Sequence, residues 1–438
     1  MRSRRRFVGV LLGLVAQAGG AQTVDLMTVV EQALEHDAEL SQARAGYEAA
    51  QQALPRARAD LLPRIDGGWG RAFNRITSES LPATRYWQNG WTVNLTQPLF
   101  DWSRWVSYQQ ADFVAARGAL ELAGARQALI VRAARAYFDV LAAEDEQARA
   151  IDYAAAITAH LRALRLRKSA GEATLIDLRE ADALGEQAQL QELDARNDLE
   201  LKWRAIEQLT GRRFASLSRL SHHAVPPRVV PEDAQAWAAQ ARAQGYPVQL
   251  GRIEWEIARL DVGKVRAERY PVVNLTAGYT PAGAASGYAR PTTTTTAMVS
   301  VTVPLFTGGG PQARLRESLA LEDKAEGKWL SAARQAEAEA RESFSRFQWG
   351  VQRIDMLTRL AKSSAESLSA IQVGYKVGER TSVDVFRAFE SLYASRRDLL
   401  RARYETLVAL LRLKAATGVL DSGEVARINA QLEGEPPS

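Results

Sequence analysis

The stretch that decides the fold is Trp91-Thr-Val-Asn-Leu-Thr-Gln-Pro-Leu-Phe-Asp-Trp-Ser-Arg-Trp105, because a strand pattern gives way within it to a helix pattern. Before Pro98, apolar and polar residues alternate with the period of two that is typical of a half-buried β-strand. After Phe100 no proline occurs until Pro226, and the tract is rich in residues that favour helix. We therefore predict a strand over about residues 88–98 and a helix over about 101–168, roughly 100 Å long at 1.5 Å per residue.

Apolar residues recur along this predicted helix at steps of three, four and seven. Such a heptad pattern indicates helices that pack as a coiled coil, and its many alanines allow them to approach closely. An ordinary globular domain does not contain a helix of this length. The heptad positions are Leu122, Leu129, Ala133, Ala136, Val140, Ala143, Ala150, Ala154, Ile157, Leu161 and Leu164.

The chain then repeats this organisation. Pro98-Leu-Phe100 returns as Pro304-Leu-Phe306, and Thr210-Gly211 returns as Thr417-Gly418. Three further pairs keep similar offsets: Pro63 with Pro271, Gly171 with Gly378, and Asp177 with Asp384. Internal repeats of this kind indicate a duplicated structural unit. We predict two structural repeats, at 22–225 and 226–420, and a C-terminal tail at 421–438.

Each predicted repeat contains helix, two strands, a very long helix and a further helix. In the first repeat, after an initial helix, we expect strands at about 64–76 and 88–98 and helices at about 101–168 and 174–210. In the second we expect helices at about 232–270, 311–375 and 382–417, with strands at about 272–281 and 296–305.

Residues 1–21 read as a signal peptide for export. Four arginines among the first six residues precede an apolar stretch over 7–18, and small residues follow at 19–21. The alternative is a buried first helix. No later stretch reaches the length of about 18 apolar residues that a transmembrane helix needs. The same arginines supply most of the net charge of +5, so the rest of the chain is nearly neutral and has no bulk attraction to nucleic acid.

Four strands cannot close a barrel, since the smallest membrane barrels use about eight. An open sheet edge in lipid would leave backbone groups without partners. If these strands lie in a membrane, several copies of the chain must pool them; three copies would give twelve strands and would gather their long helices into one hollow bundle. The predicted fold is thus mainly α with a small membrane β part. Half-buried hairpins in a soluble domain are the alternative.

Four stretches together resemble the TolC-type outer-membrane factors, the exit ducts of tripartite efflux pumps and type I secretion systems. The similarity covers roughly residues 25–425 and is carried by the ordered set rather than by any one motif. These stretches are Ala59-Asp-Leu-Leu-Pro-Arg-Ile65, Leu95-Thr-Gln-Pro-Leu-Phe-Asp-Trp-Ser-Arg-Trp105, Ala136-Tyr-Phe-Asp-Val-Leu141 and Gly374-Tyr-Lys-Val-Gly-Glu-Arg-Thr-Ser-Val-Asp-Val385.

The resemblance implies a homotrimer with a 12-stranded barrel in the outer membrane and a long α-helical barrel in the periplasm. It also implies a gated periplasmic tip, which opens when an adaptor and an inner-membrane pump of the ABC or RND type dock. The expected function is passive conduction of cargo from the pump to the outside. The alternative from another class is a soluble periplasmic coiled-coil scaffold or adaptor.

The resemblance places the gate at the two glycine turns, Gly171 and Gly378. Asp177 and Tyr375 match residues that hydrogen-bond between helix pairs and hold the tip shut; the alternative for Tyr375 is simple packing. Arg380 matches a gate arginine, whose usual threonine partner is replaced here by Ile176, which accepts no hydrogen bond.

At the entrance constriction the resemblance aligns Asp384 with one ring of aspartates, whereas Arg387 stands where a second ring falls. Three aspartates and three arginines sum to zero charge, and a spacing of three residues allows each pair to meet on one helix. We therefore expect weak cation selectivity and weak block by multivalent cations. The alternative is an ordinary surface ion pair worth under about 1 kcal/mol.

The tryptophans near the two ends of the second strand are expected to anchor a barrel at the lipid headgroups. They are Trp87, Trp91, Trp102 and Trp105. The alternative is core packing in a soluble hairpin.

Nothing in the sequence indicates an enzyme. It contains no phosphate-binding Gly-x-x-x-x-Gly-Lys, no Gly-x-Ser-x-Gly and no His-Glu-x-x-His motif. The chain has no cysteine, which excludes disulfides, thiolate metal sites and a lipid anchor on cysteine. The pair His222-His223 is expected to lie in a loop rather than bind metal. We expect no cofactor and no metal.

Overall fold

The computed structural model describes residues 23–77, 79, 82–170, 174–221, 224, 226–280 and 293–432. Its helices and strands form two repeats, in each of which short helices are followed by two strands and two long helices. In chain order they are α1 (Leu26–His36), α2 (Ala38–Gln51), α3 (Ala53–Ala59), β1 (Arg64–Ile76), β2 (Thr84–Phe100), α4 (Trp102–Ser169), α5 (Leu175–Thr210), α6 (Ala234–Gln244), α7 (Tyr246–Ala267), β3 (Val272–Thr280), β4 (Thr294–Thr302), α8 (Gly310–Lys376), α9 (Ser382–Ala416) and α10 (Ser422–Asn429).

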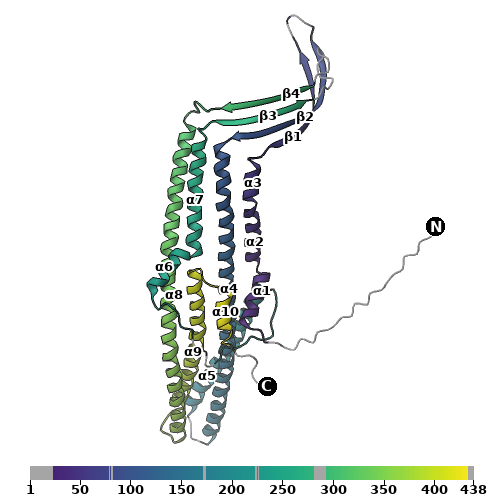
Figure 1. Cartoon of the computed structure of the whole chain (residues 1–438). Coiled ribbons are helices and arrows are strands. Elements are labelled where there is room, and N and C mark those ends of the chain that lie inside the picture. The colour runs from purple at the N-terminus through teal and green to yellow at the C-terminus, as the bar shows by residue number, and fades with distance from the viewer. Residues whose placement is uncertain are drawn as a thin grey trace, which may run out of the picture.

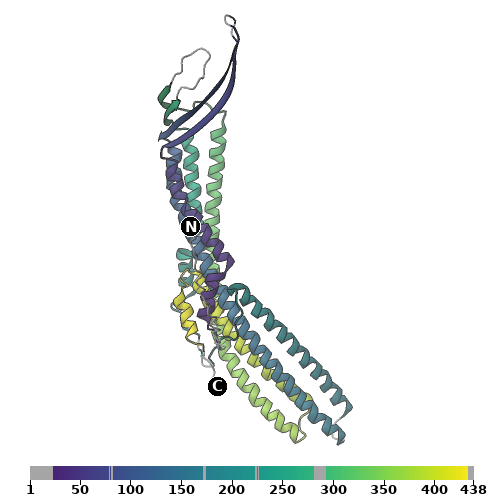
Figure 2. The same ribbon diagram turned by 90° about the vertical axis from the view of Figure 1, so that its right-hand side faces the viewer.

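The molecule is a long column of helices with its only described sheet at one end (Figure 1). The helices α4 and α8 have 68 and 67 residues and run unbroken from the sheet to the opposite end. At 1.5 Å per residue each is about 100 Å long. The shorter helices pair with them: α2, α3 and α5 along α4, and α6, α7 and α9 along α8. The lower helices run at an angle to the upper ones (Figure 2).

Local sequence sets the ends of these helices. The carboxylate of Asp101 accepts a hydrogen bond from the backbone N–H of Arg104 and so caps the start of α4. Along α4, most of the heptad positions are buried, among them Leu129, Val140 and Ile157. They form two clusters, one at mid-height against α1 and α10 and one near the far end against α5 and α9.

The predicted helix at 232–270 is wrong as a single element. The structure has two helices there, α6 and α7, which meet at Gly245. Pro247 stands in the first turn of α7, where its missing N–H is tolerated, and it cannot continue a helix that arrives from α6. The predicted tail at 421–438 likewise contains a helix, α10, whose start is capped by Asp421.

The four strands form one antiparallel sheet in the order β1-β2-β3-β4. β2 begins at Thr84, earlier than predicted, because it pairs along the whole of β1 up to Thr84 opposite Ile76. Trp91 therefore lies inside the strand and not near its end. β4 ends at Thr302, before the predicted 305.

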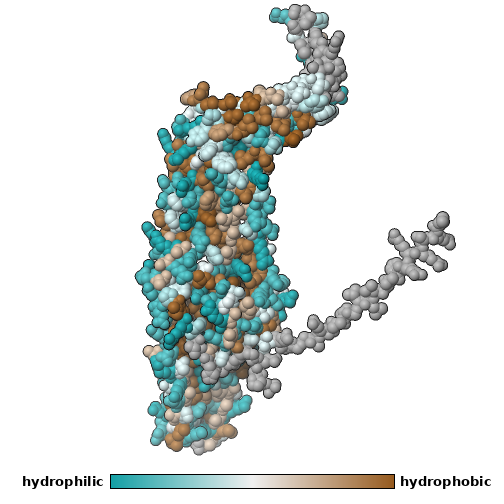
Figure 3. Space-filling model, viewed as in Figure 1, coloured by the Kyte–Doolittle hydropathy of each residue, from teal (hydrophilic) through white to brown (hydrophobic). Residues whose placement is uncertain are grey.

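The registers place most of the large apolar side chains together on one face of the sheet, which Arg71 shares, and mostly small or polar side chains on the other, with Val272 and Met298 among them. Figure 3 shows hydrophobic residues gathered over this end of the molecule. Many of these side chains are strongly exposed in the single chain, including Trp69 at 72% and Val301 at 62%. We call this face the apolar face; its large apolar side chains are Ile65, Trp69, Phe73, Trp87, Trp91, Val93, Leu95, Val273, Leu275, Tyr279, Val299 and Val301.

The two repeats end alike. α5 ends at Thr210, and Thr417 caps the end of α9; both residues are fully buried, and their hydroxyls donate to the carbonyl oxygens four residues earlier. The next residues, Gly211 and Gly418, have φ values of 68° and 75°, which favour glycine. Among the described residues, no helix combines the length and the apolar character needed to cross a lipid bilayer.

A close approach of α8 and α9 leads to a stability prediction. A Cβ added at Gly350 would lie 3.2 Å from both Cβ and Cγ2 of the buried Thr406. We expect Gly350→Ala to lower the free energy of unfolding by about 1–3 kcal/mol, because the two helices must separate. Gly327→Ala in the same helix is the matched control, since a Cβ there meets nothing within 4 Å and alanine favours helix. Denaturant unfolding of both variants measures the difference; equal stabilities would contradict the expectation.

Candidate functional site

The end of α4 and the start of α5 lie with the end of α8 and the start of α9 at the end of the molecule far from the sheet (Figures 1 and 2). We call this end the tip. In the second turn Gly378 has a φ of 83°, and the N–H of Glu379 donates to the carbonyl of Gly374 at 2.9 Å to close the helix. The corresponding Gly171 of the first turn lies outside the described residues.

Tyr375, at the end of α8, packs on α4 rather than forming a hydrogen bond within the described structure. Its ring centroid lies 5.1 Å from that of His160, and the guanidinium of Arg167 lies 4.9 Å from it, over the ring. Its hydroxyl is buried and has no hydrogen-bond partner among the described residues. The side chain of Asp177 lies outside the described residues, so the predicted bond between Asp177 and Tyr375 stays a prediction.

His160 is the link between the two helix pairs at the tip. Besides Tyr375 of α8, its ring meets the ring of Phe386 of α9 edge-on at 4.7 Å. Its Nε2 is buried and has no partner among the described residues. Burial, and then the positive charge of Arg167, lower the pKa of His160 below its ordinary value of 6.5. The sequence alone did not single out His160, because contacts between residues more than 200 apart leave no local pattern.

A hydrophobic cluster continues this link away from the tip. It joins α4, α5 and α9, and Phe389 connects it to a smaller cluster between α8 and α9. The two helix pairs are therefore held together by side-chain packing within one chain. The buried members of the larger cluster are Tyr153, Ala154, Ile157, Leu164, Ala181, Ala188 and Phe386.

Asp384 caps the start of α9. Its Oδ2 accepts hydrogen bonds from the N–H and hydroxyl of Thr381 at 3.0 and 2.9 Å, and Thr381 Oγ1 accepts from the N–H of Asp384. This capping box lowers the pKa of Asp384, first through the backbone bond from Thr381 and then through its hydroxyl, with smaller contributions from Arg380 and Arg387. Within the described chain no oxygen–nitrogen contact of 4 Å or less joins Asp384 to Arg387, so this carboxylate is held by the cap.

Arg380 lies on the turn before this cap and is exposed. Its aliphatic part covers Gly374, where a Cβ would lie 2.9 Å from Arg380 Cγ. Ile176 is 77% exposed. Arg380 and Ile176 therefore do not form the contact that the resemblance assigns to an arginine and a threonine at these positions.

The four predicted anchor tryptophans are all exposed, by 42–54%. Trp87 and Trp91 lie on the apolar face of β2, where they meet the rings of Phe73 and Tyr279 at 5.2 and 5.7 Å. Trp102 and Trp105 begin α4 beside the sheet. No neighbouring side chains in the single chain cover them as a core would.

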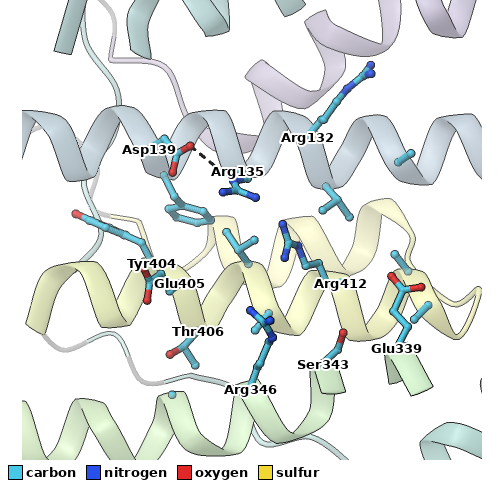
Figure 4. A pocket seen from close by; sticks show the side chains of 18 of the residues that line it. Arg132, Arg135, Asp139, Glu339, Ser343, Arg346, Tyr404, Glu405, Thr406 and Arg412 are labelled. Atoms are coloured by element: carbon cyan, nitrogen blue, oxygen red, sulfur yellow. Dashed lines mark ion pairs between the residues drawn. The ribbon is translucent and has the colours of Figure 1, made fainter. Parts of the chain in front are cut away.

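An open groove of about 1480 Å³ between α4, α9 and α8 was not predicted. Figure 4 shows Arg135 of α4 and Arg412 of α9 reaching into the space between their helices. Arg135 pairs with Asp139 of its own helix at 3.8 Å, as Arg346 does with Glu342 at 2.6 Å. Charges four residues apart predict a solvated helix face but not a groove.

Acid should loosen the tip through His160. The folded state lowers its pKa, so the packing is fully stable above about pH 6.5 and weakens as the pH falls below that value. We expect amide exchange in residues 153–168 and 375–393, corrected for the intrinsic rate, to accelerate between pH 7.5 and 5.5. His160→Phe keeps a ring between Tyr375 and Phe386 but cannot be protonated, and should abolish the acceleration. The same acceleration in both proteins would contradict this assignment.

Among the described residues no group of three or more histidine, aspartate or glutamate side chains is placed to hold a metal ion. His222 and His223 lie outside the described residues.

The chain is similar to known proteins along almost its whole length. The family model described as outer membrane efflux protein matches it twice, at residues 29–212 and 237–419. The outer membrane protein TolC of Vibrio cholerae is 27% identical over 98% of both chains. The proteases secretion protein PrtF of Dickeya chrysanthemi is 26% identical over 99% of this chain and 96% of its own.

Two solved structures share the fold along nearly the whole chain. CusC superimposes with a TM-score of 0.80 at 17% identity, covering 95% of this chain and 98% of its own. The CmeC outer membrane channel of Campylobacter jejuni gives 0.81 at 15% identity, covering 99% and 98%. The double match of the family model takes in most of both repeats, and the chain belongs to the outer membrane efflux protein family.

Proposed function

We propose that this protein is an outer-membrane channel, the exit duct of a tripartite efflux pump or type I secretion system. The observation that carries the proposal is the sheet with one mainly apolar face, from which two unbroken helices of about 100 Å run to a distant tip. An apolar band on one face and small polar residues on the other suit strands between lipid and a water-filled lumen. The long helices would then extend through the periplasm.

The proposal requires three copies of the chain. The sheet of one chain ends in two open edges, and backbone groups on those edges cannot face lipid unpaired. Three chains would supply twelve strands and close the sheet. The same arrangement would place the three tips around one axis, and an adaptor and an inner-membrane pump would dock there. The channel itself performs no reaction, and the pump supplies the energy.

In this duct the tip is the gate. Tyr375, packed between His160 and Arg167, ties the end of α8 to α4, and Asp177 and Arg380 belong to the same gate. Beyond it, Asp384 and Arg387 form the entrance constriction, where three charges of each sign cancel. Trp87, Trp91, Trp102 and Trp105 contact the lipid at the membrane end.

Fractionation distinguishes the channel from a soluble periplasmic scaffold. The channel should remain in the outer-membrane fraction, require detergent for release, and run as a trimer that becomes a monomer on heating. A scaffold would leave the cell on osmotic shock as a water-soluble protein. Release by osmotic shock would refute the proposed function.

A further inference from the structure

Three arginines stand on the apolar face of the sheet, at the end of the first hairpin away from the helices. β1 and β2 continue there beyond β3 and β4 (Figure 1). Successive side chains of a strand alternate between its two faces, so Arg71 and Arg75 share the face of Phe73. Arg85 joins them, because it lies directly opposite Arg75 in the register. All three residues are exposed, and we call them the arginine cluster.

The arginine cluster lies at the height of the outer lipid headgroups if the apolar face meets lipid. The strand from Ile65 to Arg75 covers about 33 Å at 3.3 Å per residue. A strand tilt of about 40° reduces this to about 25 Å across the bilayer, which is the height of the apolar band of a membrane barrel. Arg71 stands deeper on the same strand, and a side chain of its length reaches outward to the polar level.

Within the described hairpin no carboxylate pairs with the arginine cluster. The sequence from residue 67 to residue 100 contains a single acidic residue, Glu79. The only ion pair among the described residues of the sheet joins Arg64 to Asp66, near the opposite end of β1. Like charges directly opposite each other destabilise a sheet, as Arg75 and Arg85 do here. The cluster therefore favours an anion from outside the chain.

Aromatic rings position one member of the cluster. The guanidinium of Arg71 lies 4.5 Å from the ring centroid of Trp87, over its face. Trp87 in turn meets the ring of Phe73 at 5.2 Å. A guanidinium that stacks on a ring keeps the N–H groups along its edge free to bind an anion. The arrangement is thus a positive charge held on an apolar surface.

The second hairpin lacks this cluster although its register is the same. Arg64 opposite Thr96 corresponds to Val272 opposite Thr302. By the same offset Tyr279 stands in β3 where Arg71 stands in β1, and β3 and β4 contain no charged residue. A hairpin of this sheet therefore forms without arginines on its apolar face, and the cluster is a property of the first hairpin alone.

We infer that the arginine cluster binds the phosphate groups of a lipid headgroup in the outer leaflet of the membrane. The planar guanidinium matches the oxygens of a phosphate in a bidentate manner, and Arg75 and Arg85 are near enough to share one group. A bound phosphate would also remove the repulsion between these two residues. The inference rests on the proposed function, because it requires the apolar face to meet lipid, and it adds a ligand to that face.

The surroundings of the cluster favour a phosphorylated glycolipid over free phosphate. Towards the helices the same face presents Trp69 and Trp91, which lie opposite each other and are 72% and 49% exposed. Such rings suit the boundary between headgroups and acyl chains. An amphipathic ligand meets both the arginines and the rings, whereas inorganic phosphate meets the arginines alone. The lipid A part of lipopolysaccharide, which carries phosphates and acyl chains on one sugar backbone, has this chemistry.

Binding of lipid A to the protein purified in detergent from the outer membrane tests the inference. The probe is lipid A with both phosphates, and its dissociation constant is measured by titration against each protein. Arg75→Gln combined with Arg85→Gln removes two charges and leaves the rings in place. Arg64→Gln is the matched control, since it makes the same change on the same strand at the opposite end and on the other face. Arg71→Gln serves as a second variant if the double variant gives little trimer.

We expect the double variant to bind lipid A at least about tenfold more weakly than the unmodified protein and Arg64→Gln, because two charge-assisted contacts are lost. Lipid A stripped of its phosphates should bind all of these proteins equally weakly. Equal affinities of the three proteins for lipid A, or of the unmodified protein for the two lipids, overturn the inference, while a heat-sensitive trimer in the outer membrane still supports the proposed function.

Inorganic phosphate distinguishes the two sources of the ligand. It should not displace lipid A at an equal concentration, and displacement at that concentration would assign the cluster to free phosphate and overturn the lipid ligand. A protein that leaves the cell on osmotic shock would overturn both the inference and the proposed function.

Discussion

Replacing Tyr375 by alanine should open the tip. The change removes the ring contact with His160 and the cation–π contact with Arg167, which together tie α8 to α4. Contacts of these two kinds are worth about 0.5–1.5 and 0.5–1 kcal/mol. A loss of about 1.4 kcal/mol changes an equilibrium tenfold, and a trimer loses the contacts three times. We expect single-channel conductance to rise several-fold and cells to become sensitive to the large antibiotic vancomycin.

Tyr375→Phe separates ring packing from hydrogen bonding. The hydroxyl has no partner among the described residues, so phenylalanine keeps both ring contacts and should behave like the unmodified channel. If Tyr375→Phe and Asp177→Ala instead open the tip as far as Tyr375→Ala does, a hydrogen bond between Asp177 and Tyr375 is the restraint. Unchanged conductance and vancomycin sensitivity in all three variants would remove Tyr375 from the gate.

Replacing Arg387 by aspartate should convert a weakly blocked channel into a strongly blocked one. In the unmodified trimer, three Asp384 and three Arg387 cancel, and hexaamminecobalt should bind poorly. Arg387→Asp gives six carboxylates around the pore, and each unit charge about 4 Å from a cation contributes about 1 kcal/mol per cation charge even in water. We expect the concentration that blocks conductance to fall at least about a hundredfold, which corresponds to about 2.7 kcal/mol.

Arg387→Gln is the control, since it removes the positive ring without adding carboxylates and should fall between the two. The capping box with Thr381 keeps Asp384 charged and in place in all three proteins. Micromolar block of the unmodified channel, or block that is the same in all three, would show that Arg387 does not face the pore and is an ordinary surface residue.

The sequence predicts the fold class because prolines delimit its elements. The proline-free tract after Pro98 holds α4 and α5, the tract after Pro311 holds most of α8 and all of α9, and the four alternating stretches became the four strands. The beginning of β2 was missed because residues 84–87 are a strand only through their pairing with residues 73–76 across the hairpin. The break between α6 and α7 was missed because composition alone favours helix on both sides of Gly245 and Pro247.

Less of the candidate site than of the fold could be predicted from the sequence. A family resemblance pointed to Tyr375 and Asp384, but it did not indicate the contacts of Tyr375 with His160 and Arg167 or the cap on Asp384. His160 and Arg167 lie more than 200 residues before Tyr375, and a heptad pattern identifies which face of α4 is buried without identifying what covers it. The cap on Asp384 was readable in principle, since a threonine stands three residues before an aspartate at the start of a helix.

Two of the four long helices that reach the tip end partway along the molecule, and the other two do not. α5 and α9 end midway along the molecule, just before Gly211 and Gly418, whereas α4 and α8 continue past that level without interruption. A tip that swings outward can therefore pivot α5 and α9 at their glycine ends but must flex α4 and α8 along their length. In the proposed channel, opening would therefore bend α4 and α8 elastically, and the two bent helices would return the tip to its resting position.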